Sequence, residues 1–131
     1  MKKQFVLEGP EEFDFKVFAI NSHAKEYRLC WNINKQLKMD FAKKEDYKIQ
    51  ENLYFSRYNY ICEQGTEHNI FRNQSKNGYL IPEHKNINYF LVADKGLDNE
   101  ELVKKLNNVK DILLAFELDK KTIKNIDRLI F

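Results

Sequence analysis

The chain has 131 residues, of which 22 are basic, 20 acidic and 43% hydrophobic, and its formal net charge is +2. This length suits a single globular domain, residues 1–131, whose core needs neither a metal nor a disulfide to fold. The composition excludes a disordered chain, the nearly balanced charge excludes a histone-like nucleic-acid binder, and the lack of an apolar run longer than five residues excludes a membrane-spanning helix.

Residues 1–12 carry two Lys near their start but turn acidic before any apolar signal-peptide core develops. We therefore expect a cytoplasmic protein, with a first segment that is flexible or weakly paired. Residues 13–20 then alternate, with Phe13, Phe15 and Val17 on one face and Phe18 and Ile20 on the other. This pattern predicts a central strand that is buried on both faces.

Residues 24–37, AKEYRLCWNINKQL, predict a helix with an N-cap at Asn21 or Ser22. A broad apolar arc on this helix comprises Tyr27, Leu29, Cys30, Trp31, Ile33 and Leu37. The opposite, polar face comprises Lys25, Arg28, Asn32, Lys35 and Gln36. Asn34 lies inside the apolar arc, so we expect its amide to bond to a neighbouring backbone group or a Tyr hydroxyl.

Residues 53–62 and 68–74 predict two strands of a hairpin, with Gly65 at the left-handed position of its turn. Residues 75–78, Ser-Lys-Asn-Gly, predict a second hairpin with a type I′ turn, and the strand after it ends at Pro82.

Residues 88–94 predict a further strand, followed by a helix with Asp98 as N-cap and Leu97 and Leu102 as a hydrophobic staple. The buried stripe of this helix comprises Leu102, Val103, Leu106 and Val109. Residues 111–118 form the next strand, which gives a β-α-β unit with a right-handed crossover if its strands are parallel. In residues 120–131 the apolar spacing predicts a short amphipathic helix that docks back on the domain.

These elements predict an α+β fold: a mainly antiparallel sheet of about six strands, two main helices on one face, and a short C-terminal helix. Neither Cys-x-x-Cys nor His-Glu-x-x-His occurs, so we expect no metal and no cofactor.

One short motif stands between the second hairpin and the strand at 88–94. The chain reads Ile81-Pro82-Glu83 and then Ile87-Asn88-Tyr89. This resembles the IPExxxVDY family of small Bacteroidota proteins. Further positions that support the resemblance are Phe13 to Phe15, Tyr27, Leu29, Trp31, Asn34, Ala115 to Leu118 and Leu129 to Phe131. The resemblance implies a small bacterial domain, but no activity and no catalytic residue.

The chain departs from the motif at Ile87, which replaces Val, and at Asn88, which replaces Asp. An amide cannot act as a general base, so the motif is expected to organise a turn. Pro82 fixes φ, Glu83 accepts N–H groups from the following turn, and Asn88 keeps part of the hydrogen-bonding role of a carboxylate. The alternative is a small polar site built from Glu83, His84, Asn88 and Tyr89.

Three functions remain open from the sequence. The leading hypothesis is a non-catalytic adaptor that binds an acidic protein partner through Lys25, Arg28 and Lys35. The alternative is an RNA-associated protein with a stacking platform on the sheet, comprising Tyr54, Tyr58, Tyr60 and Phe71, all expected to be exposed, beside Arg57 and Arg72. An enzyme or small-ligand site around Glu83 has the least support. A homo-oligomer is compatible with each function.

Overall fold

The computed structural model of this chain describes residues 15–94 and 99–130. The expectations for residues 1–12, for Phe13 and for the helix start at Leu97 and Asp98 lie outside these residues.

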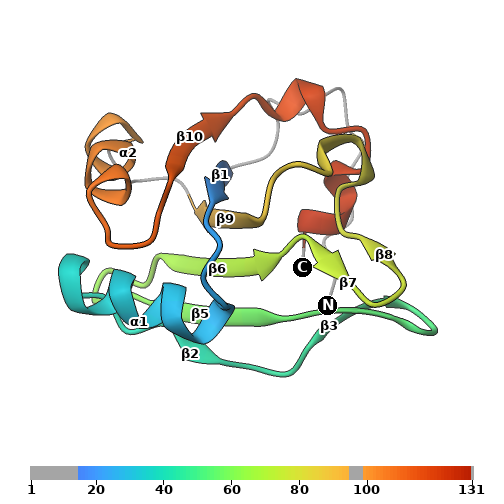
Figure 1. Cartoon of the computed structure of the whole chain (residues 1–131), viewed down its shortest axis with the longest axis horizontal. Coiled ribbons are helices and arrows are strands. Elements are labelled where there is room, and N and C mark those ends of the chain that lie inside the picture. Colours follow the sequence, from blue (N-terminus) through green and yellow to red (C-terminus); the bar gives the residue numbers. More distant parts are fainter. Residues whose placement is uncertain (1–14, 95–98, 131) are drawn as a thin grey trace.

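A six-stranded antiparallel sheet forms the centre of the domain (Figure 1). Every neighbouring pair runs antiparallel. The strands in spatial order are β10 (Leu114–Leu118), β1 (Phe15–Asn21), β9 (Tyr89–Asp94), β6 (Glu67–Arg72), β5 (Arg57–Ile61) and β2 (Ala42–Lys43). The predicted α+β fold is confirmed.

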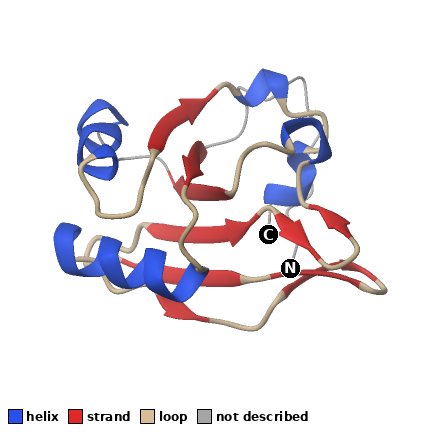
Figure 2. Cartoon of the chain, in the orientation of Figure 1, coloured by secondary structure: helices blue, strands red, loops and turns tan. Residues whose placement is uncertain are grey.

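The core has two parts, one on each face of the sheet. Helices α1 (Glu26–Leu37) and α2 (Asn99–Asn107) cover one face, where Leu29, Ile33 and Leu106 pack against Phe18, Ile20 and other strand residues. The second face is covered by hairpins and short 3-10 helices, which lie toward the opposite end of the molecule from α1 and α2 in Figure 2. These elements are β3 (Tyr47–Gln50), β4 (Leu53–Phe55), β7 (Gln74–Ser75), β8 (Gly78–Tyr79), η2 (Pro82–His84), η3 (Lys120–Thr122) and η4 (Ile126–Leu129).

Strand β1 lies inside the sheet, as its two apolar faces predict. Val17 and Ala19 point to the second face, whereas Phe18 and Ile20 point to the helices. Because β9 and β10 are both antiparallel to β1, they run parallel to each other. The β-α-β unit is therefore present, with β1 inserted between its two strands.

The predicted strand at 53–62 is two strands, interrupted at Ser56. β4 pairs with β3 in a separate two-stranded sheet, and only β5 joins the main sheet. The β5–β6 hairpin is confirmed, with Gly65 at φ +83°. The β7–β8 hairpin is also present, but its central residues are not among the described residues with positive φ, so the predicted type I′ turn is wrong.

Helix α1 is rotated relative to the prediction. Tyr27 is 66% exposed and Trp31 is 59% exposed, although both were expected in the apolar arc. Asn32, expected on the polar face, is only 4% exposed, because its Nδ2 donates to the Lys110 carbonyl and to Asp111 Oδ2. The helix also starts at Glu26 with no side-chain cap, while Ser22 Oγ accepts from the N–H of Ala24 before the helix.

The C-terminal residues form two 3-10 helices in place of one amphipathic helix. Ile123 and Leu129 are nevertheless buried on the second face of the sheet, as their spacing predicts. Three hydrogen bonds fix η4 on that face: Tyr47 donates its hydroxyl to the Arg128 carbonyl at 2.6 Å, and Arg128 Nη1 donates to the carbonyls of Leu80 at 2.9 Å and Tyr79 at 3.2 Å.

Among the described residues, strand β10 pairs on one side only, with β1. On it, Ala115 is held by the side chain of Asn107 at the end of α2. Asn107 Nδ2 donates to the Ala115 carbonyl and Asn107 Oδ1 accepts from the Ala115 N–H, both at 2.8 Å. An amide side chain thus supplies the pair of hydrogen bonds that a neighbouring strand would make.

Candidate functional site

The Ile81–Tyr89 segment, called the motif loop below, is organised by Asn73. Asn73 is fully buried, and its Nδ2 donates to the carbonyls of His84 and Ile87 at 2.8 and 2.9 Å. Its Oδ1 accepts from the N–H of Ile81 at 2.9 Å. One buried amide therefore satisfies three backbone groups of the motif loop. In the sequence, only the position of this Asn between two strands could have pointed to its role.

Glu83 ties the motif loop to the C-terminal residues. Its Oε2 accepts the backbone N–H groups of Lys124 and Asn125, so the expectation that it bonds to the turn following it is wrong. Burial alone would raise the pKa of Glu83, but hydrogen bonds from the backbone N–H groups of Glu83 itself, Asn125 and Lys124 hold it below 4.5.

The end of the motif loop is tied to the connection between β1 and α1. Asn88 Oδ1 accepts from the N–H of Ser22 at 2.9 Å, and Asn21 Oδ1 accepts from the N–H of Asn88 at 3.1 Å. Tyr89 donates its hydroxyl to the Ala24 carbonyl at 2.6 Å. Burial raises the pKa of Tyr89 to about 12, so this phenol stays protonated near neutral pH.

The structure does not bring the four residues of the alternative polar site together. Glu83 bonds to residues 124 and 125, and His84 Nε2 lies 3.3 Å from Thr122 Oγ1. Asn88 and Tyr89 instead line a small pocket whose lining includes neither Glu83 nor His84. These contacts support the turn-organising interpretation of the motif.

The expected RNA-stacking platform is also divided. Phe71 is fully buried on the second face, whereas Tyr58 and Tyr60 pack on the helix-covered face. Tyr54 belongs to the separate β3–β4 sheet. The expected exposure of Phe71 is therefore wrong.

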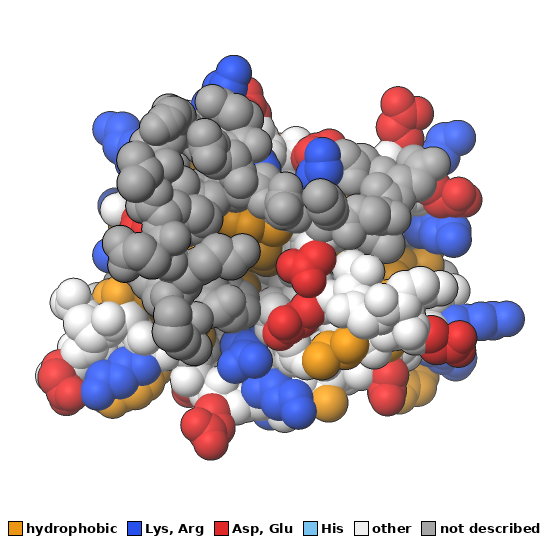
Figure 3. Space-filling view, turned by 180° about the vertical axis from the view of Figure 1, so that it is seen from behind, with side chains coloured by type: hydrophobic (Ala, Val, Ile, Leu, Met, Phe, Trp, Pro, Cys, Tyr) orange, Lys and Arg blue, Asp and Glu red, His pale blue; other side chains and the backbone are white. Residues whose placement is uncertain are grey.

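The two Arg residues of that platform are engaged by neighbours. Arg57 Nε donates to Asn69 Oδ1 at 3.0 Å, and Arg72 Nη1 pairs with Glu26 Oε1 at 3.0 Å. Seen from behind, Lys and Arg side chains are interspersed with Asp and Glu around the described surface (Figure 3). Such mixing gives a weak field for attracting a polyanion.

The outer side of α1 presents aromatic and basic side chains together. We define the α1 surface as Tyr27, Arg28, Trp31 and Lys35. The Lys35 ammonium lies 4.8 Å from the centroid of the Trp31 ring. Arg28 Nε lies 2.9 Å from Asp111 Oδ2, and this hydrogen bond lowers the pKa of Asp111. Lys25 is exposed at the start of the same helix.

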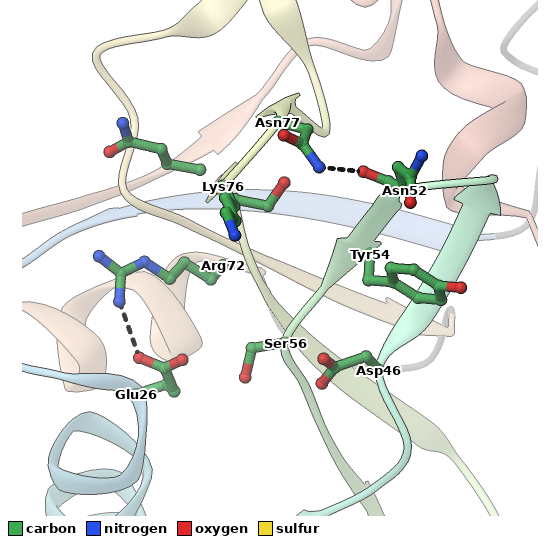
Figure 4. Close-up of a pocket in the computed structure, with 10 residues that line it drawn as sticks. Glu26, Asp46, Asn52, Tyr54, Ser56, Arg72, Lys76 and Asn77 are labelled. Carbon is green, nitrogen blue, oxygen red and sulfur yellow. Dashed lines mark hydrogen bonds and ion pairs between the residues drawn. The ribbon is translucent and has the colours of Figure 1, made fainter.

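A polar cleft opens beside the first turn of α1. Its larger part, the groove, has a volume of about 770 Å³ and lies between α1, the Ser56 interruption and the β7–β8 hairpin. Figure 4 shows the Arg72–Glu26 pair at one end of the groove and Tyr54 with Asn52 at the other. Burial alone would raise the pKa of Glu26, but hydrogen bonds from its own backbone and from Ser56, together with the charge of Arg72, lower it.

A smaller pocket has a volume of about 170 Å³ and shares Arg72 and Gln74 with the groove. We call it the anion pocket because its lining includes two basic and no acidic side chains; it comprises Ser22, His23, Ala24, Arg72, Gln74, Lys85, Ile87, Asn88 and Tyr89. Among the residues that the structure describes, no group of three or more His, Cys, Asp or Glu side chains could hold a metal ion. Within the same residues, no helix is long and apolar enough to cross a membrane.

Cys30 is buried, which raises the pKa of its thiol to about 12 and leaves it unreactive.

Comparison with known proteins returns no match for this chain, either to a protein-family model or to a curated protein.

Proposed function

We propose that this protein is a non-catalytic adaptor that docks its α1 surface on an acidic surface of a protein partner. The observation that carries the proposal is the exposure of Trp31, the single Trp of the chain, on the outer face of a regular helix. Tyr27 lies one turn away and is exposed to a similar extent. Two large rings in contact with water on one helix face are typical of an interface anchor.

The composition of the α1 surface matches that of interaction hot spots. Trp, Tyr and Arg are the residues that contribute most binding free energy at protein interfaces. Arg28 is oriented by Asp111, and Lys35 lies against the Trp31 ring, so both basic groups are partly ordered before a partner arrives. This ordering reduces the entropy lost on binding.

The charge of this face favours an acidic partner over a second copy of the chain. Lys25, Lys35 and Lys38 are all exposed on α1 or at its ends. Docking two copies through the same face would bring these like charges together, whereas an acidic partner would neutralise them. The resemblance to the IPExxxVDY family stays a prediction and brings no activity to this proposal.

The test begins with the partner captured from native lysate, which is then purified and titrated against the pure protein. We expect the emission of Trp31 to shift to shorter wavelength on binding, because the indole leaves water. Trp31→Ala should weaken binding about 30-fold, which corresponds to about 2 kcal/mol for a hot-spot Trp. Lys35→Glu should also weaken binding, and the loss of affinity should be larger at low salt than at high salt.

Lys104→Glu is the matched control, because Lys104 is exposed on α2 and is not part of the α1 surface. It should bind as the wild type does. Equal affinity of Trp31→Ala and wild type for the purified partner would overturn the proposal, and so would recovery of a complex that forms only between copies of this chain.

A further inference from the structure

The anion pocket is built by three segments that are distant in sequence. Ser22 and His23 come from the connection between β1 and α1, Arg72 and Gln74 from the β6–β7 junction, and Lys85 and Asn88 from the motif loop. Because water occupies about 30 Å³ in the liquid, about 170 Å³ is enough for a phosphate-sized group with a few bound waters.

The lining of the anion pocket offers hydrogen-bond donors and positive charge. Arg72 and Lys85 are cationic, and none of the lining residues is acidic. Nη1 of Arg72 donates to Glu26 Oε1, and Glu26 lines the groove. Among the described residues, no partner is found for the other guanidinium N–H groups of Arg72 or for Nδ2 of Asn88. A planar guanidinium with free N–H groups is suited to an oxyanion.

The pocket is preformed. Asn88 Oδ1 accepts from the N–H of Ser22, and the Tyr89 hydroxyl donates to the Ala24 carbonyl. These two hydrogen bonds fix the motif loop and the connection to α1 relative to each other. Ser22 is itself buried. Asn73 fixes the other side of the motif loop. These segments therefore need no further ordering to form a binding site.

The groove lies next to the anion pocket and shares Arg72 and Gln74 with it. Its volume of about 770 Å³ is in the range of small-molecule sites. Carboxylates, amides and hydroxyls line it, comprising Glu26, Asp46, Asn52, Ser56, Gln74 and Asn77. Figure 4 shows the ring of Tyr54 at the far end. Such a lining pairs with ligand hydroxyls, which both donate and accept hydrogen bonds.

We propose that the cleft binds a small phosphate monoester with a hydroxyl-rich body, such as a sugar phosphate. The phosphate contacts Arg72, Lys85 and Asn88 in the anion pocket, and the body lies in the groove beside Glu26 and Asn77. This site is separate from the α1 surface and does not depend on the adaptor function.

The test is an NMR titration of amide chemical shifts in the full chain with three probes: a hexose phosphate, inorganic phosphate and the unphosphorylated hexose. We expect the hexose phosphate to shift the amides of Ser22, His23 and residues 85–88, and to bind about tenfold more tightly than inorganic phosphate. The hexose alone should not shift these amides at millimolar concentration.

Two variants make the charge of the anion pocket less favourable to a phosphate in different ways. Asn88→Asp keeps an oxygen for the Ser22 N–H but places a carboxylate in the anion pocket, and Lys85→Gln removes an exposed ammonium without touching the core. Each should weaken the hexose phosphate about tenfold or more, while Lys104→Gln should bind normally. Trp31→Ala should also bind normally, which separates this proposal from the adaptor.

Either of two results would overturn the proposal. One is the absence of shifts at Ser22, His23 and residues 85–88 with the hexose phosphate. The other is the same affinity for Lys85→Gln, Asn88→Asp and wild type.

Discussion

A single buried amide, Asn73, controls the shape of the motif loop. Its three side-chain hydrogen bonds reach Ile81, His84 and Ile87, so they span nearly the whole loop. Because Asn73 is fully buried, bulk water cannot reach these three backbone groups and take over its hydrogen bonds. The anion pocket depends on the loop that Asn73 holds, because Lys85 and Asn88 belong to it.

We predict that Asn73→Ala lowers the free energy of unfolding by roughly 2–4 kcal/mol, because it leaves two carbonyls and one N–H of the motif loop unsatisfied. The measurement is urea unfolding, with a lower midpoint and an unchanged slope. Asn77→Ala is the matched control: Asn77 is exposed and donates one hydrogen bond, to the Asn52 carbonyl. A loss below about 0.5 kcal/mol for Asn73→Ala would contradict the assigned role.

Residue types alone could not place the polar residues of this fold. Asn34 met its expectation, since its amide bonds to both the N–H and the carbonyl of Phe41. Asn32 did not, because its partners Lys110 and Asp111 lie far along the chain. Those partners draw Asn32 inward and leave Tyr27 and Trp31 facing water. Helical periodicity identifies a stripe, but long-range polar contacts decide its exact rotation.

At the scale of elements, α2 does more than cover the sheet. The side chain of Asn107 continues the hydrogen-bond pattern of β10 at Ala115. It also donates to the Val103 carbonyl within α2, so the helix end and the strand are fixed together. The contact joins the two ends of the loop that connects α2 to β10.

We predict that Asn107→Ala lowers the free energy of unfolding by about 1–2 kcal/mol and accelerates hydrogen exchange at the Ala115 amide. Asn108→Ala is a closely matched control, because the Asn108 amide donates within α2, to the Lys104 carbonyl, with no bond to β10. Hydrogen exchange measured by NMR should therefore differ at Ala115 between the two variants. Equal exchange rates there would contradict the prediction.

The elements that the sequence predicted are those with strong apolar alternation. β1, β5, β6 and β9 bury side chains on at least one face, so their patterns were visible. β2 and β3 were missed, because they lie in a charged stretch and expose most of their side chains. Strand order was not accessible either, since alternation reports which face is buried and not which strand lies alongside.

For the whole molecule, several titratable groups make stability depend on pH in one direction. Burial lowers the pKa of His68 below 6.5, and its Nε2 is buried with no hydrogen-bond partner among the described residues. Glu26, Glu83 and Asp111 also have lowered pKa values, for the reasons given above. In each case the unfolded chain binds a proton at a higher pH than the folded chain does, so acidification favours unfolding.

We predict that the free energy of unfolding falls in two phases, first below about pH 6.5 as His68 protonates in the unfolded chain, and then below about pH 4.5 as the carboxylates do. Urea unfolding at a series of pH values measures both. His68→Gln should flatten the first phase and Glu83→Gln should reduce the second, so each variant serves as the control for the other. A stability that rises between pH 7 and pH 5 would contradict this assignment.

The place of β1 between β9 and β10 has a consequence for synthesis of the protein. On the ribosome, β1 is made before the other described strands. Its partner strands β9 and β10, which carry Leu91 and Ala115, are the last of them to be made. At about 5 to 20 residues per second, the interval from Val17 to Leu118 lasts roughly 5 to 20 s. Until β9 is made, Phe18 and Ile20 have no strand beside them, while the local β5–β6 hairpin can already close. The nascent chain therefore offers an apolar segment to chaperones until β9 and β10 emerge from the ribosome.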